Sequence, residues 1–387
     1  MNMRKYIFFS ATAVVLSLLA VAGCSKENTS GWNAGDNIQF GARTQSSALT
    51  RAAYSGVTTT IDHKVYERID WESGDKVRVL SDQTVNKAGT ATPYYDYTVQ
   101  ADGTADGRYS YTTIDNDNSA TELAKTLHWG SSSAHTFYSV YPASGVTTTT
   151  STSPCGTFTG YISEDQTPAS GYISKDGSGN YTLIPNLAQY MMMTAKHAGV
   201  TPSDYEKLPY DKSSLFLDFY PVTTAIQFTI TNSMVADFDV KSIELESANY
   251  NLSGYFTVDL SDSSIDNGDP SGHTAAATGT PAATKTVSMT FSTGGTVKIA
   301  NGKSLTFTFF INPGQGTSNV NDLVFRITNQ DGKIRSAKLA DSSGDITFKT
   351  HHKTIISGMF LPEDIKWSLL YNPQIDPWTK DPSTIIF

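Results

Sequence analysis

Charged residues, cysteines and histidines are all scarce in this sequence. Lys, Arg, Asp and Glu make up 17% of its 387 positions, against about 25% in an average globular protein. The formal net charge of −9 argues against nucleic acid as a partner and against electrostatic binding to a membrane surface. The seven histidines are scattered, and the neighbours His351 and His352 would point to opposite faces of a strand. The sequence therefore predicts no metal site built on histidine.

The motifs of common enzyme classes are also missing. The sequence has no nucleophile elbow, Walker loop, zinc-ligand spacing or dinucleotide fingerprint. Asp115, Asp117 and Ser119 begin like a calcium loop, but the glycine that its sharp turn requires does not follow. A pair of glycosidase carboxylates is defined by its separation in space, so the sequence singles out none. We therefore predict no catalytic residue, no metal and no cofactor. A polysaccharide-degrading enzyme on a β scaffold is the least favoured alternative.

A mostly apolar stretch near the N-terminus has the composition of an export signal. Residues 7–22 follow a short basic region and end at small residues before Cys24. Because the stretch is shorter than the ~20 residues that span a membrane, we assign residues 1–23 to a signal peptide. A cysteine directly after Ala-Gly is the lipobox form of such a signal, which predicts that Cys24 is acylated. Cys155 is then the one other cysteine, so no intramolecular disulfide can form.

Aromatic residues, in contrast, are abundant. The chain contains 20 Tyr and 18 Phe, and 39% of its residues are hydrophobic, a composition that suits pleated, half-buried sheet surfaces. Apolar and polar residues alternate, while apolar stripes at helical spacing are nearly absent. The alternating runs are bounded by Gly, Asn, Asp, Ser or Pro and are predicted as strands. They cover residues 76–80, 94–100, 137–141, 226–230, 256–260, 287–291, 305–311 and 323–327.

Short strands separated by turn signals predict an all-β fold. We expect two β-sandwich domains in tandem, of transthyretin-like or Greek-key type, at residues 52–212 and 213–365. The boundary follows a polar, irregular stretch, residues 196–212. The one helix expected covers residues 187–197, in which three consecutive methionines, 191–193, serve as core filler.

The segment between Cys24 and the first domain carries an alternating strand and an exposed arginine. Ile38, Phe40 and Ala42 fall on one face of a strand, so this strand is expected to cover the core of the first domain. Arg51 follows in a linker of small, Ser- and Thr-rich residues. The position of Arg51 between a lipid anchor and the first domain makes it a candidate site for a trypsin-like protease. An isolated arginine in a loop is otherwise an ordinary exposed residue.

The C-terminal residues, 366–387, form a second alternating apolar segment. Trp367, Leu369, Tyr371 and Ile375 fall on one face of a strand. The further apolar side chains are Trp378, Ile385 and Phe387. This tail is a candidate donor strand for a neighbouring subunit, interrupted by prolines that cannot donate to a ladder. The other interpretation is that it forms the last strand of its own second domain.

Several motifs, in this order and spacing, resemble the fimbrillin superfamily, the type V pilins exported by Gram-negative gut and oral bacteria. The matching segments are spread over most of the chain. They are the lipobox at Cys24, the step Arg51-Ala52, residues 69–77 (IDWESGDKV), 135–142 (HTFYSVYP), 162–168 (ISEDQTP), 219–228 (FYPVTTAIQF) and 355–362 (IISGMFLP), and then Trp367 and Trp378. The chain departs from the expected pattern at Tyr220, where a histidine is expected after phenylalanine.

The resemblance implies a fimbrial subunit that serves adhesion and has no catalytic activity. Such a precursor reaches the outer membrane as a lipoprotein, and an arginine-specific protease removes the N-terminal segment with its first strand. Carried onto this chain, Arg51 precedes the cut, Ala52 becomes the new N-terminus, and Arg43 is the second candidate. The implied partners are other fimbrial subunits, in a homo- or heteropolymer. The stalk, anchor or tip role and the host receptor are not implied.

A monomeric glycan- or protein-binding lipoprotein of the outer-membrane surface is the alternative function. Exposed aromatic side chains would then hold sugar rings, and the processing site would be unnecessary. Trp71 and Trp129 are predicted to be core or sheet-edge residues rather than such a glycan platform.

Overall fold

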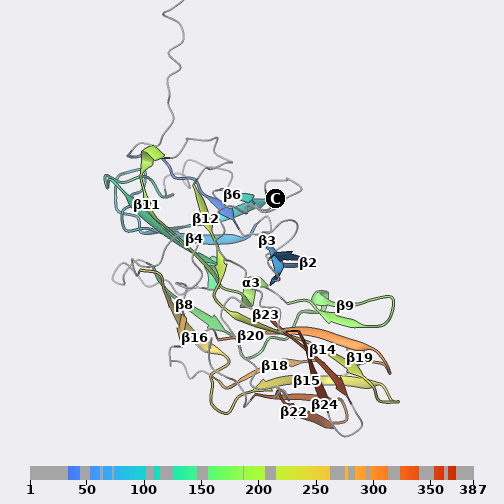
Figure 1. The fold of residues 1–387 in the computed structure, drawn as a ribbon. Coiled ribbons are helices and arrows are strands. Elements are labelled where there is room, and N and C mark those ends of the chain that lie inside the picture. Colours follow the sequence, from blue (N-terminus) through green and yellow to red (C-terminus); the bar gives the residue numbers. More distant parts are fainter. Residues whose placement is uncertain are drawn as a thin grey trace, which may run out of the picture.

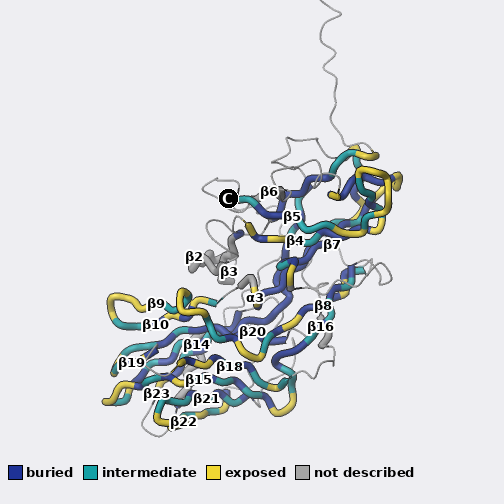
Figure 2. Tube along the Cα trace, turned by 180° about the vertical axis from the view of Figure 1, so that it is seen from behind, coloured by how far each residue is buried: buried dark blue, intermediate teal, exposed yellow. Residues whose placement is uncertain are grey.

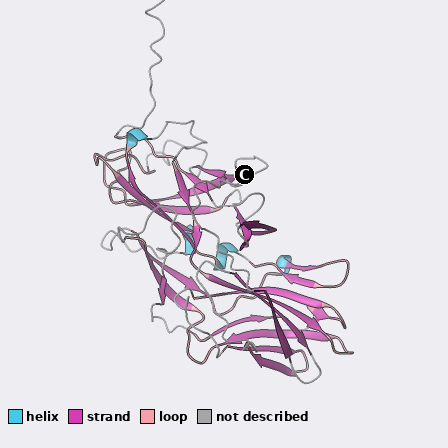
Figure 3. Cartoon of the chain, in the orientation of Figure 1, coloured by secondary structure: helices cyan, strands magenta, loops and turns pink. Residues whose placement is uncertain are grey.

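The computed structural model of the protein describes residues in fifteen segments of the chain. They are residues 34–43, 53–61, 64–71, 74–101, 109–113, 125–145, 156–185, 187–204, 215–261, 275–277, 284–292, 297–312, 323–339, 353–360 and 365–371. Nearly all regular structure in these segments is β-strand (Figure 3). This confirms the all-β fold class expected from the alternating sequence.

The first large sheet has eight strands and is built mainly from the N-terminal half. In spatial order the strands are β12 (Phe216–Asp218), β1 (Gly41–Arg43), β6 (Tyr109–Thr113), β5 (Tyr94–Ala101), β4 (Lys76–Leu80), β7 (His135–Tyr141), β11 (Met193–Val200) and β13 (Tyr220–Pro221). The terminal strands β12 and β13 are separated by a single residue in sequence, and His197 Nδ1 on β11 lies 3.0 Å from the carbonyl oxygen of Phe216 on β12. The sheet therefore curls until its two ends meet, which lets one sheet enclose a core.

Two further sheets pack face to face around a second core. The six-stranded sheet runs β24 (Ile365–Tyr371), β23 (Lys353–Phe360), β14 (Thr224–Asn232), β20 (Ser304–Ile311), β10 (Tyr181–Leu183) and β9 (Ile173–Lys175). The five-stranded sheet contains β18 (Thr286–Thr290), β15 (Phe238–Glu246), β21 (Val324–Asn329) and β22 (Ile334–Lys338), with β19 (Lys298–Ile299) beside β15. Phe228 of the first sheet meets Phe325 of the second at a ring-centroid distance of 5.2 Å. This is sandwich packing.

Smaller elements complete the described part of the chain. One three-stranded sheet contains β17 (Ala275–Ala277), β16 (Gly254–Asp259) and β8 (Thr157–Ile162), and one hairpin contains β2 (Ala53–Ile61) and β3 (Lys64–Asp70). The helical elements are α3 (Leu187–Tyr190) and the 3-10 turns at Ala143–Gly145, Ser170–Tyr172 and Pro202–Asp204. Figure 1 places β4, β6, β11 and β12 at one end of the molecule and β14, β15, β22 and β24 at the other. Within the described residues, no helix is long and apolar enough to cross a membrane.

The expected helix at residues 187–197 is wrong beyond its first turn. The helix ends at Tyr190, and β11 begins at Met193 and pairs with β7. Met191, Met192 and Met193 are at most 5% exposed, which confirms their role as core filler. Here sheet pairing overrides the good helix propensity of methionine.

The two cores draw on strands from both sides of the predicted boundary at residue 212. Phe256 and Val258 of β16 and Leu217 of β12 belong to the first core, while Tyr181 and Leu183 of β10 belong to the second. The chain thus crosses between the cores more than once, and no single cut separates all their members. Figure 2 shows buried residues continuing along the chain from one group of sheets into the other.

Candidate assembly site: the N-terminal segment and its groove

Residues 34–43, which we call the N-terminal segment, pack into the first core and make two kinds of backbone pairing. Gly35 N donates to Trp129 O over 2.8 Å, and Ile38 N donates to Leu127 O over 2.9 Å. Farther along, Gly41 N donates to Leu215 O over 2.8 Å. The segment therefore first follows the loop before β7 and then enters the eight-stranded sheet as β1.

The alternating apolar side chains of this segment fill the first core. Ile38, Phe40 and Ala42 are each 0% exposed. The Phe40 ring packs edge-on against Tyr97 and Phe137, with centroid distances of 5.2 Å and 5.1 Å. Aromatic pairs in this geometry contribute about 0.5–1.5 kcal/mol beyond their buried area. The structure thus places both Ile38 and Phe40 at the centre of the core that they were expected to cover.

β1 is an interior strand of its sheet. It pairs in parallel with β12, with Gly41 opposite Phe216, and antiparallel with β6, with Gly41 opposite Tyr111. Loss of β1 would therefore leave two neighbouring strands, β12 and β6, without their shared partner. Unpaired strand edges that flank an apolar slot readily recruit another strand.

The outer face of the segment is covered as well. The Phe216 ring lies over Gly41, and a Cβ atom added to Gly41 would overlap ring carbons Cδ1 and Cε1 of Phe216. Gln39, the preceding residue on this face, is only 5% exposed. Because Ile38, Phe40 and Ala42 share the inner face, alternation puts Gly41 on the outer face, but the sequence alone gave this glycine no role. A glycine inside an alternating strand pattern is the signal that could have indicated a close approach.

Polar side chains fix the start of the segment. Thr126 Oγ1 donates to Asn37 Oδ1 over 2.7 Å, and His128 Nδ1 lies 2.9 Å from Gly35 O. The Tyr97 hydroxyl donates to Ile38 O over 3.3 Å and accepts from Leu127 N over 3.3 Å. These bonds set the register of the strand in its groove.

A buried histidine supports the loop to which the segment pairs. His135 is 1% exposed, its ring packs edge-on against Trp129 at 4.8 Å, and its Nε2 accepts a hydrogen bond from Gly130 N over 3.2 Å. Burial lowers the pKa of His135 below its ordinary value of 6.5, and the Gln83 carbonyl and the Asp82 charge oppose that shift without cancelling it. The folded state therefore favours the neutral ring.

The processing residues expected from sequence fall in two places. Cys24, Arg51 and Ala52 lie outside the described residues. Arg43 is the last residue of β1, and its backbone lies opposite Asp218 on one side and Tyr109 on the other. A peptide bond in a doubly paired strand is a poor protease substrate, because the protease needs a backbone that is accessible and not paired with neighbouring strands. This pairing favours Arg51 over Arg43 as the predicted site.

Of the candidate donor-strand residues at the C-terminus, some lie in the described part of the chain and others lie outside it. The backbone of Trp367, Leu369 and Tyr371 lies in β24, antiparallel to β23 at the edge of the six-stranded sheet. Ile365, the first residue of β24, is 3% exposed and belongs to the second core. Ile375, Trp378, Ile385 and Phe387 lie outside the described residues. A single chain has no neighbour to receive its tail, so this pairing fits both interpretations of the tail.

The described residues offer little support for a different kind of site. Trp71 and Trp129 are 2% and 0% exposed, which confirms them as core residues and removes them as a sugar platform. No group of three or more His, Cys, Asp or Glu side chains in this part of the chain could hold a metal ion. A cleft of about 360 Å³ is lined by residues that include Gln166, Tyr172 and Tyr190. Burial raises the pKa of the Tyr190 phenol to about 12, so that phenol is not a base at neutral pH.

No protein-family model matches the chain, and no curated protein matches it. Similar solved structures are described as adhesion and fimbrial proteins. They include a putative cell adhesion protein from Bacteroides ovatus (12% identity, 87% of this chain and 96% of that chain, TM-score 0.48). A putative cell adhesion protein from Bacteroides uniformis (14%, 86% and 96%, 0.45) is another. A third is the C-terminally truncated tip fimbrial protein Mfa3 from Porphyromonas gingivalis (10%, 86% and 99%, 0.34). At these identities and TM-scores, the likenesses carry no conclusion about the role of this chain.

Proposed function

We propose that this protein is a structural subunit of a cell-surface fimbria that serves adhesion. It is exported as a lipoprotein acylated at Cys24, cleaved after Arg51 by an arginine-specific protease, and assembled by exchange of the N-terminal segment for a strand of another subunit. The observation that carries the proposal is the position of β1. An interior strand of the first sheet and the residues just before it, which together carry the fully buried side chains of Ile38, Phe40 and Ala42, are encoded before the predicted cleavage site.

The energetics of that arrangement favour exchange. Burying a side chain such as Ile38 or Phe40 stabilises a fold by about 1.5–3 kcal/mol, and the segment adds backbone hydrogen bonds on both edges. Without β1, the first domain would expose that apolar slot to water. A donated strand restores both the apolar burial and the backbone hydrogen bonds, although ordering the donor costs about 1–2 kcal/mol per residue. A groove that is filled in the precursor and vacated only after export prevents premature assembly.

The other end of the chain supplies a segment suited to donation. β24 is an edge strand, so its departure leaves the other strands of its sheet contiguous. The donor residues are those named from sequence, from Trp367 to Phe387. In this proposal the partners are other fimbrial subunits, the processing protease and, before cleavage, the outer membrane through the lipid. No cofactor and no catalysis are involved.

Mass spectrometry of the protein isolated from the cell surface tests the proposal. The expected form begins at Ala52, lacks the acyl group and migrates in assemblies much larger than one subunit. The variant Arg51→Gln should remain acylated and monomeric, whereas the matched variant Arg43→Gln should be processed normally. A surface protein that is acylated, uncut and monomeric would overturn the proposal and favour the monomeric glycan- or protein-binding lipoprotein.

A further inference from the structure

The shape of the groove around β1 restricts what can replace it. On the inner face, positions 38 and 40 carry large side chains and position 42 carries only a methyl group, and all three positions are 0% exposed. On the outer face, the Phe216 ring occupies the space that a side chain at position 41 would need. A replacement strand in this register therefore needs two large apolar residues, then glycine, then a small residue.

Phe216 is held beside this slot by its neighbours on both strands. Its carbonyl oxygen lies 3.0 Å from His197 Nδ1 on β11, and its Cα is in register with Gly41 in the parallel β1–β12 pair. Leu217, the next residue, is 0% exposed on the core side. Because successive side chains alternate across a strand, the burial of Leu217 keeps the Phe216 ring on the outer face over position 41.

The C-terminal tail of this chain does not have the required pattern. Residues 359–387 contain no glycine, so no register and neither direction places glycine beneath Phe216. The alternating set Trp367, Leu369, Tyr371 also puts a third large residue where Ala42 lies, if the first two occupy the positions of Ile38 and Phe40. In this chain the pattern occurs at residues 38–42, which leave the subunit when Arg51 is cleaved.

From this geometry we infer that the groove accepts a strand from a different protein chain, one with glycine opposite Phe216, and rejects the tail of a second copy. The inference rests on the proposed function and makes the fibre a heteropolymer at this junction. Phe216 and Gly41 then act as a specificity device, because a bulky residue at position 41 is excluded by overlap with the ring.

Peptide binding to the protein that has been cleaved after Arg51, with residues 52–387 otherwise intact, tests the inference. The probes are labelled synthetic peptides with the sequence of residues 34–43, the same peptide with Gly41→Val, and a peptide of residues 366–387, each followed by fluorescence anisotropy. We expect the Gly41→Val peptide and the tail peptide to bind at least tenfold more weakly than the native peptide. In the Phe216→Ala protein, the difference between native and Gly41→Val peptides should fall below threefold.

A tail peptide or a Gly41→Val peptide that binds the unmodified protein as tightly as the native peptide would overturn the inference. The thermal unfolding of the intact precursor provides a check that does not depend on exchange. Gly41→Val should lower its unfolding temperature, and adding Phe216→Ala should recover most of that loss. If Gly41→Val lowers the unfolding temperature equally with and without the Phe216 ring, the ring does not exclude side chains at position 41. If the native peptide itself fails to bind after the N-terminal segment has been released, the proposed function is at fault rather than the slot.

Discussion

Phe40 connects the N-terminal segment to the stability of the first core. Its ring is fully buried between Tyr97 and Phe137, so truncation removes apolar contacts and leaves a cavity. Phe40→Ala should lower the free energy of unfolding of the precursor by about 3–5 kcal/mol, measured by urea denaturation. The control Val235→Ala, at a position 96% exposed, should change it by less than about 0.5 kcal/mol. A small loss for Phe40→Ala would mean that the segment is not part of the folded core.

His135 should make the stability of the fold around the groove depend on pH. Burial lowers its pKa in the folded state, so the unfolded chain binds a proton more readily. The stabilising contribution is therefore complete above pH 6.5, the ordinary pKa of histidine, and is lost as the pH falls from 6.5 toward the lowered value. Thermal unfolding between pH 7.5 and pH 5 should show a falling midpoint. His135→Gln should flatten this part of the profile, and an unchanged slope in that variant would assign the dependence to other groups.

Single residues also mark the limit of sequence analysis. The alternation of Ile38, Phe40 and Ala42 predicted their buried face correctly, because side-chain direction in a strand follows from sequence alone. The covering of Gly41 by Phe216 depends on a parallel pairing between residues 175 positions apart, calculated as 216 − 41. No local pattern encodes such a contact. The buried environment of His135 was equally invisible in the sequence.

At the scale of elements, alternation identified strands well but not their partners. The runs at residues 226–230 and 305–311 lie in β14 and β20, which pair antiparallel along their length. In contrast, β23 joins β14 in parallel, and β16 contributes to the first core although it lies in the predicted second domain. Pairing partners and core membership are set by the packing of the whole chain, so short-range patterns do not determine them.

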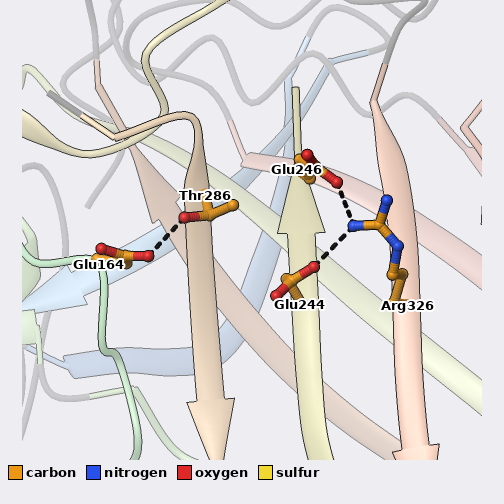
Figure 4. Close-up of polar contacts among 5 residues, drawn as sticks. All are labelled: Glu164, Glu244, Glu246, Thr286 and Arg326. Carbon is orange, nitrogen blue, oxygen red and sulfur yellow. Dashed lines mark hydrogen bonds and ion pairs between the residues drawn. The ribbon is translucent and has the colours of Figure 1, made fainter. Parts of the chain in front are cut away.

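The five-stranded sheet carries a charged ladder on its surface. Arg326 on β21 donates to Glu244 Oε1 on β15 over 2.7 Å and also contacts Glu246, while Glu164 accepts a hydrogen bond from Thr286 over 2.6 Å (Figure 4). The hydrogen bond to Glu246 is the main cause of the raised pKa of Arg326.

Because the Arg326 side chain is 34% exposed, solvent screens this ladder. Arg326→Gln should cost no more than about 1 kcal/mol, and the difference should shrink in 1 M salt. Urea unfolding at two salt concentrations measures it. The more exposed pair Lys298–Asp237, at 3.3 Å, provides the control, and Lys298→Gln should cost less than Arg326→Gln. A loss above about 3 kcal/mol for Arg326→Gln would mean that the ladder fixes the pairing of β15 and β21.

At the scale of the whole molecule, the two terminal segments occupy opposite kinds of position. β1 is interior to its sheet and anchored in the first core, whereas β24 lies at the edge of the six-stranded sheet. Removing an interior strand breaks two pairings and opens a core, while removing an edge strand breaks one. In the proposed function, this arrangement would keep the groove filled until cleavage and would let the C-terminal strand leave its sheet without opening a core.

A deletion of residues 366–387 should consequently leave the precursor folded. We expect its unfolding temperature to stay within about 4 °C of that of the complete chain, since the lost edge strand leaves β23 paired with β14. The same variant should be cleaved after Arg51 on the cell surface but should be absent from large surface assemblies, as measured by mass spectrometry and size-exclusion chromatography. The matched deletion of residues 24–51, which removes β1, should lower stability far more. If the C-terminal deletion instead unfolds the chain, the tail is the last strand of its own domain, and donation must come from elsewhere.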